Sequence, residues 1–135
     1  MLEHSFTRLA DFSNPPHLVS CKDPLEEEGF RSGIFHLDDT SVVFAASDAL
    51  SHYVLMMYEL SKSAEFESEL MELRMKQTSN SQLLQMAEKE KFNFADEVLY
   101  PLLRSVDSEV DFKKLMESLY AKRLIDIDDY TLATL

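Results

Sequence analysis

The spacing of apolar residues changes several times along the chain, and each change predicts a different element. Residues 1–30 carry no regular spacing, because the Asn-Pro-Pro sequence at 14–16 and later acidic residues interrupt it. Two stretches follow at 33–37 and 41–46, both rich in β-branched and aromatic residues and separated by the polar residues 38–40. This pattern predicts a strand, a short turn and a second strand.

The second predicted strand and the segment after it are apolar on nearly all sides. Residues 41–46 lack the alternation of a half-exposed strand, which predicts a central strand covered on both faces. Ser47 and Asp48 then end the strand with two residue types that cap helix N-termini. Residues 49–60 carry apolar side chains almost all round, which predicts a buried helix or one that packs against a larger body.

The stretch 64–123 has the clearer spacing of amphipathic helices. The signals that locate these helices are apolar stripes and capping residues: Phe66, Leu70 and Leu73; Ser79 with Gln82; Asn93 ahead of Pro101; and Asp107 ahead of Phe112, Leu115, Met116, Leu119 and Tyr120. Pro101 is expected to kink or end its helix. Residues 130–135 alternate in part and predict a terminal strand, so the expected fold class is α+β.

Composition and charge remove several classes of function. The chain has 135 residues, about the size of one domain, and 45% of them are hydrophobic. It carries 13 Lys and Arg against 25 Asp and Glu, a net charge of −12, so no nucleic-acid partner is expected. The single cysteine, Cys21, excludes a disulfide framework and a thiolate zinc site, and two glycines exclude a glycine-rich phosphate loop. Because no long apolar run and no signal sequence is visible, we expect a cytoplasmic protein without a membrane partner.

Two aspartates occupy places where carboxylates can be held rigidly. Asp48 follows the second predicted strand directly, and Asp128 precedes the terminal strand. If the two side chains converge, they form a site for a hard cation such as Mg²⁺ or Mn²⁺. The alternative from spacing alone is that Asp48 is a helix cap and that Asp126, Asp128 and Asp129 form a solvated turn.

Two segments resemble motifs of one enzyme family. Residues 37–50, Leu-Asp-Asp-Thr-Ser-Val-Val-Phe-Ala-Ala-Ser-Asp-Ala-Leu, resemble the "G-D-x-hydrophobic run-S-D-G-L" motif of the PPM-type (type 2C, metal-dependent) serine/threonine protein phosphatases. Residues 127–132, Ile-Asp-Asp-Tyr-Thr-Leu, resemble the "D-[ND]-x-[ST]-hydrophobic" entry to that family's last strand. The resemblance implies part of a PPM-type β-sandwich flanked by helices, with a mostly helical insertion before the last strand.

The resemblance also implies roles for individual residues. Asp48 and Asp128 match the positions of aspartates that ligate Mg²⁺ or Mn²⁺ in the family. Asp129 matches the position that orients the neighbouring ligand, and Ser47 supports the site without binding metal. In the family a metal-bound water attacks the phosphorus of a phosphoserine or phosphothreonine, so a phosphoprotein substrate is implied and no side chain of this chain is identified as catalytic.

The match covers only the C-terminal half of the family's domain. Asp38 and Ala49 replace two of the motif's glycines, and nothing in residues 1–29 matches the acidic segment, metal loop or phosphate-binding Arg of the N-terminal half. Residues 1–135 are therefore expected to be a single domain or a fragment of a phosphatase-like domain, and whether the protein is an enzyme stays open. We expect no phosphatase activity from these residues alone.

A second class of function competes with the phosphatase interpretation. The chain could be a non-catalytic interaction module, either a degenerate phosphatase fold or an unrelated helical adaptor. As a fragment, it is expected to expose the apolar helix 49–60 or to cover it by self-association. Weaker signals are the pair Asp48 and His52, spaced for a transition metal or a simple hydrogen bond, and methionines that could line a peptide groove or fill the core.

Overall fold

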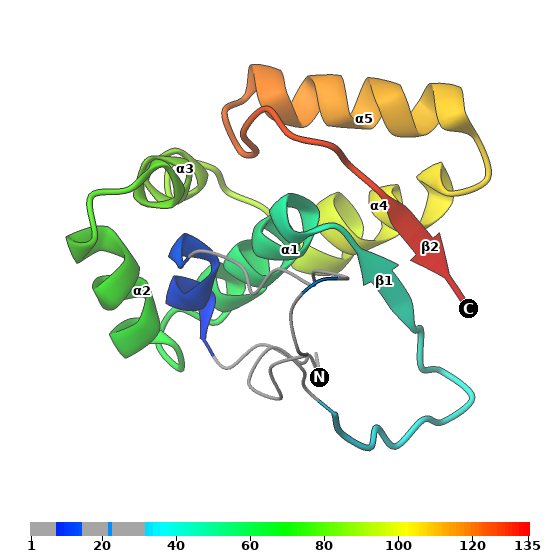
Figure 1. Ribbon diagram of the computed structural model, residues 1–135, viewed down its shortest axis with the longest axis horizontal. Coiled ribbons are helices and arrows are strands. Elements are labelled where there is room, and N and C mark those ends of the chain that lie inside the picture. The colour runs from blue at the N-terminus through cyan, green and yellow to red at the C-terminus, as the bar shows by residue number, and fades with distance from the viewer. Residues whose placement is uncertain (1–7, 15–21, 23–31) are drawn as a thin grey trace.

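The computed structural model describes residues 8–14, 22 and 32–135 (Figure 1). Cys21, Gly29 and most of the stretch expected to be irregular lie outside the described residues. Within them the chain forms a mostly helical α+β domain with a two-stranded antiparallel sheet, in agreement with the predicted fold class. No helix among the described residues is both long enough and apolar enough to cross a membrane.

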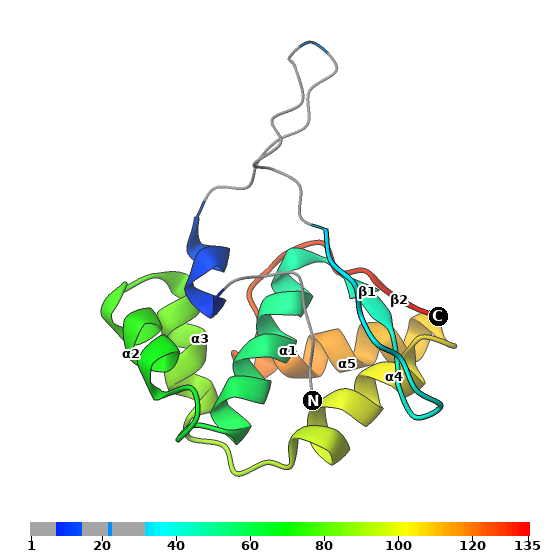
Figure 2. The ribbon, with the colours of Figure 1, turned by 90° about the horizontal axis from the view of Figure 1, so that it is seen from below.

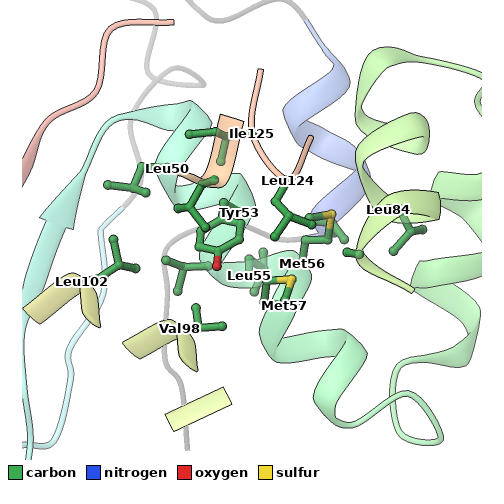
Figure 3. Packing of buried hydrophobic residues seen from close by; sticks show 14 of the residues in the cluster. Leu50, Tyr53, Leu55, Met56, Met57, Leu84, Val98, Leu102, Leu124 and Ile125 are labelled. Atoms are coloured by element: carbon green, nitrogen blue, oxygen red, sulfur yellow. The ribbon is translucent and has the colours of Figure 1, made fainter. Parts of the chain in front are cut away.

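Helix α1 (Asp48–Ser61) is the centre of the molecule. The other helices lie around it, with α2 and α3 on one side and α4 and α5 on the other (Figures 1 and 2). Its central turns are buried on every face, as expected for a helix without a polar side. Figure 3 shows its side chains packing toward α3, α4 and the segment after α5, through Leu84, Leu102 and Leu124.

This burial corrects one expectation about the helix. The segment 49–60 was expected to be exposed, or covered by a second copy, if the chain is a fragment. That expectation of exposure is wrong, because the chain's own helices supply the partner surfaces: Met56 is fully buried and Val54 and Leu55 are nearly so. Self-association itself stays a prediction, without the exposed helix as its basis.

The sheet pairs β1 (Phe44–Ala46) with β2 (Leu132–Thr134), and Ala45 lies opposite Ala133. The ladder continues past the strands, since the Ser47 N–H donates to the Thr131 carbonyl at 3.0 Å. The prediction that this strand is central and covered on both faces is therefore wrong. β1 pairs with a single described strand, and Ala45 is exposed.

The predicted first strand, 33–37, is also absent. The turn that was expected to follow it does form, with the Ser41 N–H donating to the Asp38 carbonyl at 3.0 Å. The arm before the turn pairs with no described strand, and Ile34 is 87% exposed. β-propensity expresses how well a side chain packs in a sheet, so a segment with no neighbouring strand stays irregular whatever its composition.

Two short helices form one side of the domain, α2 (Glu67–Met75) and α3 (Ser79–Ala87). Leu70 and Leu73 of the predicted stripe are buried, which confirms that pattern. The predicted capping box does not form, because Thr78 rather than Ser79 is the N-cap of α3 and its side chain makes no capping hydrogen bond. A 3-10 turn, η1 (Leu9–Ser13), packs beside both helices and α1.

The other side begins with a π-helical turn, η3 (Phe94–Leu99), which runs into α4 (Tyr100–Ser105). Asn93 caps this turn as predicted, its Oδ1 accepting from the Asp96 N–H at 3.1 Å. Pro101 lies where the π-helical turn changes into the α-helix α4, and the helical backbone continues past it to Ser105 instead of ending there. The last helix, α5 (Glu109–Ala121), is capped by Ser108 and not by Asp107.

Candidate functional site: an acidic groove at the start of α1

A groove of about 410 Å³ lies where four segments meet: η1, the first turns of α1 and α3, and the loop before β2. The described residues that line it are Phe12, Ser13, Asp48, Ala49, His52, Thr78, Ser79, Asn80, Leu83, Asp126, Ile127 and Asp128. Three of these side chains are carboxylates, and none of the described lining residues is Lys or Arg. The groove therefore has a negative potential above a partly apolar surface.

The groove brings together the two aspartates singled out from the sequence. Asp48 is the first residue of α1, immediately after the sheet, and Asp128 lies in the loop that leads into β2. Because β1 and β2 are antiparallel and in register, the residue after β1 and the residues before β2 lie at the same end of the sheet. Both side chains consequently line one groove.

Ser47 helps to hold this end of the sheet together. It was expected to support the site, and its residue type suggested a helix cap. In the structure its hydroxyl caps nothing; instead Oγ accepts a hydrogen bond from the Thr131 N–H at 3.2 Å. The side chain and the main chain of Ser47 thus both bond to Thr131, across the two segments that carry Asp48 and Asp128.

The aspartates of the groove share one local geometry. The Oδ1 atom of Asp48 accepts from the N–H of Ala49 at 2.9 Å, and that of Asp128 accepts from the N–H of Asp129 at 2.8 Å. Asp129 is exposed and is not one of the lining residues, so its contact with the neighbouring carboxylate is made by its main chain. The second oxygen of each carboxylate accepts no hydrogen bond from a described residue.

Asp126 is a member of the groove that the sequence did not single out. Spacing placed it in a solvated acidic turn, and its Oδ1 accepts from the Ile127 N–H at 2.9 Å in the same geometry as the other two. It lines the groove together with Asp48 and Asp128. Its position two residues before Asp128 was the available signal, since alternate residues of an extended segment point to the same side.

His52 is the second member that stands out. It lies one helical turn after Asp48, lines the groove, and is only 3% exposed. No described residue makes a hydrogen bond to its Nε2 atom, and its ring packs edge-on against Phe12 at 5.3 Å between centroids. Burial lowers the pKa of His52 to about 4, so the imidazole is neutral at pH 7.

The wall of the groove opposite α1 is formed by polar side chains that join η1 to α3. The Asn80 amide donates to Ser13 Oγ at 3.3 Å, and the Ser13 and Thr78 hydroxyls lie 3.5 Å apart. The Lys76 ammonium donates to the Ala10 carbonyl at 3.2 Å, which anchors the same 3-10 turn from α2. These contacts fix the turn whose residues close the groove.

Comparison with models of protein families, with curated proteins and with solved structures finds no match to this chain. The geometry of the groove and of the sheet beside it is therefore the basis for a function.

The carboxylates do not form a closed metal site by themselves. Among the described residues, no group of three or more His, Asp or Glu side chains lies close enough together to hold a metal ion. Carboxylate oxygens are nevertheless the donors that Mg²⁺ and Mn²⁺ take, and these ions keep several water ligands. Asp48 and Asp128 can serve as two ligands of such an ion only if others come from outside the described residues.

Proposed function

We propose that the chain is the C-terminal part of a PPM-type phosphatase-like domain, in which Asp48 and Asp128 are ligands of Mg²⁺ or Mn²⁺. The observation that carries the proposal is that both aspartates line the same groove, although 80 residues separate them in the sequence. The alternative in which Asp48 is only a helix cap and Asp128 only a turn residue requires no such convergence. The motif order, strand then helical insertion then strand, agrees with the observed element order.

The donor set suits a hard cation. The two carboxylates carry negative charge and each has an uncommitted oxygen, while the Asp129 N–H holds the Asp128 side chain in one orientation. When bound in a phosphatase, such an ion supplies an acidic water and offsets charge on the phosphoryl oxygens. What this chain contributes is the rigid placement of two ligands by the Ser47–Thr131 pairing, and the remaining ligands are proposed to come from an N-terminal half of the domain.

The exposed arm before β1 supports the same proposal. Ile34, Leu37 and Val42 are half-exposed or more, within one short segment of strand-forming composition. Clusters of large apolar side chains on a surface are typical of sites that another segment or chain covers. In a complete β-sandwich, further strands would pair with this arm and cover it. Without such strands, a segment of strand-forming composition stays irregular.

Metal binding can be tested on the chain itself with Mn²⁺, which broadens the NMR signals of nearby amides. We expect broadening at the amides around Asp48 and Asp128, reduced in Asp48→Asn and in Asp128→Asn. Glu117→Gln is the matched control, since Glu117 is an exposed residue of α5 outside the groove. Broadening that is equal in all four proteins would show that the two aspartates are not ligands.

On this proposal, catalysis requires a protein that also contains the N-terminal half of the domain. There, Asp128→Asn is expected to reduce the hydrolysis of a phosphoserine peptide by orders of magnitude while leaving the melting temperature almost unchanged, because a ligand carboxylate contributes little to folding. The 135-residue chain alone is expected to be inactive on para-nitrophenyl phosphate with Mn²⁺. An unchanged rate of hydrolysis in Asp128→Asn would show that Asp128 is not a metal ligand.

One observation favours a non-catalytic interaction module as the second candidate. The described part of the chain packs its own core around α1, as an independently folded module does. A module of this kind is expected to sediment as a monomer and to unfold in one cooperative step without metal. Aggregation, or a melting temperature that depends on Mn²⁺, would argue for the phosphatase fragment instead.

A further inference from the structure

Metal binding by two aspartates accounts for only part of the acidic groove. Asp48, Asp126 and Asp128 all line it, yet no three such groups are close enough together to share one ion. Negative charge that is spread along a groove is better matched by a cation whose own charge is spread over several donors. A guanidinium group is planar, always protonated, and has five N–H donors.

The rest of the lining fits the same ligand class. Phe12, Leu83 and Ile127 supply apolar surface, against which the aliphatic stem of an arginine-like ligand can pack. The described lining residues include no cation that would compete for the carboxylates. A groove of about 410 Å³ lies within the size range of pockets that bind small ligands or single side chains.

His52 is the independent observation that points to a ligand. Its side chain is 97% buried, that is 3% exposed, and its Nε2 has no hydrogen-bond partner among the described residues. A buried polar atom without a partner costs free energy, which a ligand can recover by supplying the missing hydrogen bond. A neutral imidazole can accept an N–H donor that a protonated one would repel.

We infer that the groove formed by Asp48, Asp126, Asp128 and His52 binds a guanidinium group, as the arginine side chain of a peptide or as a free guanidinium compound. The inference goes beyond the proposed function, because it needs neither a metal ion nor the proposed N-terminal half of the domain, and because Asp126 is not a proposed metal ligand.

The test compares an end-capped peptide Gly-Gly-Arg-Gly-Gly with the same peptide containing citrulline, which has nearly the same shape and no charge. Amide shifts are followed by NMR in EDTA, so that metal cannot contribute. We expect the arginine peptide to shift the groove residues and the citrulline peptide to leave them unchanged. Propylguanidine, a free compound with one positive charge, distinguishes the sources: equal affinity for propylguanidine and the peptide assigns the site to the guanidinium alone, and weaker binding of propylguanidine assigns it to a peptide.

Asp126→Asn is the decisive variant, with Glu117→Gln as its control. Asp126 is exposed, and a single exposed ion pair contributes about 0.2–1 kcal/mol, so the affinity for the arginine peptide should fall by about 1.4-fold to fivefold. The control should bind as the parent does. Equal binding of the citrulline peptide, shifts outside the groove, or an unchanged affinity in Asp126→Asn would overturn the inference. The Mn²⁺ titration of Asp126→Asn separates the two proposals, since broadening near Asp48 and Asp128 should persist there whatever happens to the peptide.

Discussion

Glu59 and His52 are two buried ionisable groups of α1 whose pKa values move in opposite directions. Glu59 is 3% exposed and its Oε2 makes no hydrogen bond to a described residue. Burial, with a smaller effect from the negative charge of Glu69, raises the pKa of Glu59 from 4.5 to about 7. Burial alone lowers the pKa of His52 from 6.5 to about 4.

The sign of each contribution to stability follows from these shifts. The folded state keeps Glu59 protonated up to about pH 7, whereas the unfolded state ionises it near pH 4.5, so this group loses stability as the pH rises between those values. The folded state keeps His52 neutral down to about pH 4, whereas the unfolded state protonates it near pH 6.5, so this group loses stability as the pH falls.

The two contributions oppose each other between about pH 4.5 and 6.5. In that window each state holds one proton on the pair, on Glu59 when folded and on His52 when unfolded, so the pair adds almost no slope to the free energy of unfolding. Glu59→Gln removes the contribution of Glu59 to the pH dependence and leaves that of His52. The difference in unfolding free energy, variant minus parent, should then rise with pH by up to about 1.4 kcal/mol per pH unit, and by about 3 kcal/mol in all at most.

The assay is urea unfolding of both proteins in half-unit steps of pH, followed by circular dichroism. Carboxylates other than Glu59 titrate alike in the parent and the variant, so subtraction leaves the contribution of Glu59. His52→Gln should give a difference curve of the opposite sign, falling as the pH rises through the same window. Parallel stability curves for the parent and Glu59→Gln would refute the reasoning, because they would mean that Glu59 titrates equally in the folded and unfolded states.

Two further substitutions test the core and the sheet end. Met56→Ala should lower the free energy of unfolding by about 2–5 kcal/mol, because Met56 is fully buried, whereas Met71→Ala, at a residue 52% exposed, should change it by less than about 0.5 kcal/mol. Equal effects in urea unfolding would contradict the packing around α1. Ser47→Ala should lower the free energy of unfolding by about 1 kcal/mol. It should also accelerate hydrogen exchange at the Thr131 amide, because that amide loses its acceptor, the Ser47 Oγ. Unchanged exchange at that amide would show that the side-chain bond is not formed in solution.

Local patterns predicted the helical part of the fold well. The helix at 49–60, the stripe that contains Leu70 and Leu73, and the Asn93 cap depend on residues close together in the sequence, and all three are found. The arm 33–37 shows the limit of such patterns. Its composition favours a strand, but a strand forms only when another segment offers hydrogen bonds along its edge, and no described segment does so.

The groove was only partly predictable for a related reason. The positions of Asp48 and Asp128 at the ends of strands were visible in the sequence, as was the spacing of His52 from Asp48. The opposite wall was not visible, because it depends on the meeting of Ser13 with Thr78 and Asn80 across more than 60 residues of sequence. These contacts result from the packing of η1 against the helices. They leave no periodic pattern in the sequence around Ser13 or in the sequence around Thr78 and Asn80.

The helical core holds the two-stranded sheet in place, and the sheet in turn places Asp48 and Asp128 at one of its ends. A sheet of two three-residue strands is marginal in water by itself. Here Phe44 and Leu132 pack on the core, and the Ser51 hydroxyl of α1 donates to the Ala46 carbonyl at 3.2 Å, so the strands are fastened to the central helix. The acidic groove can therefore form without further strands, and binding at the groove can be tested on the chain itself.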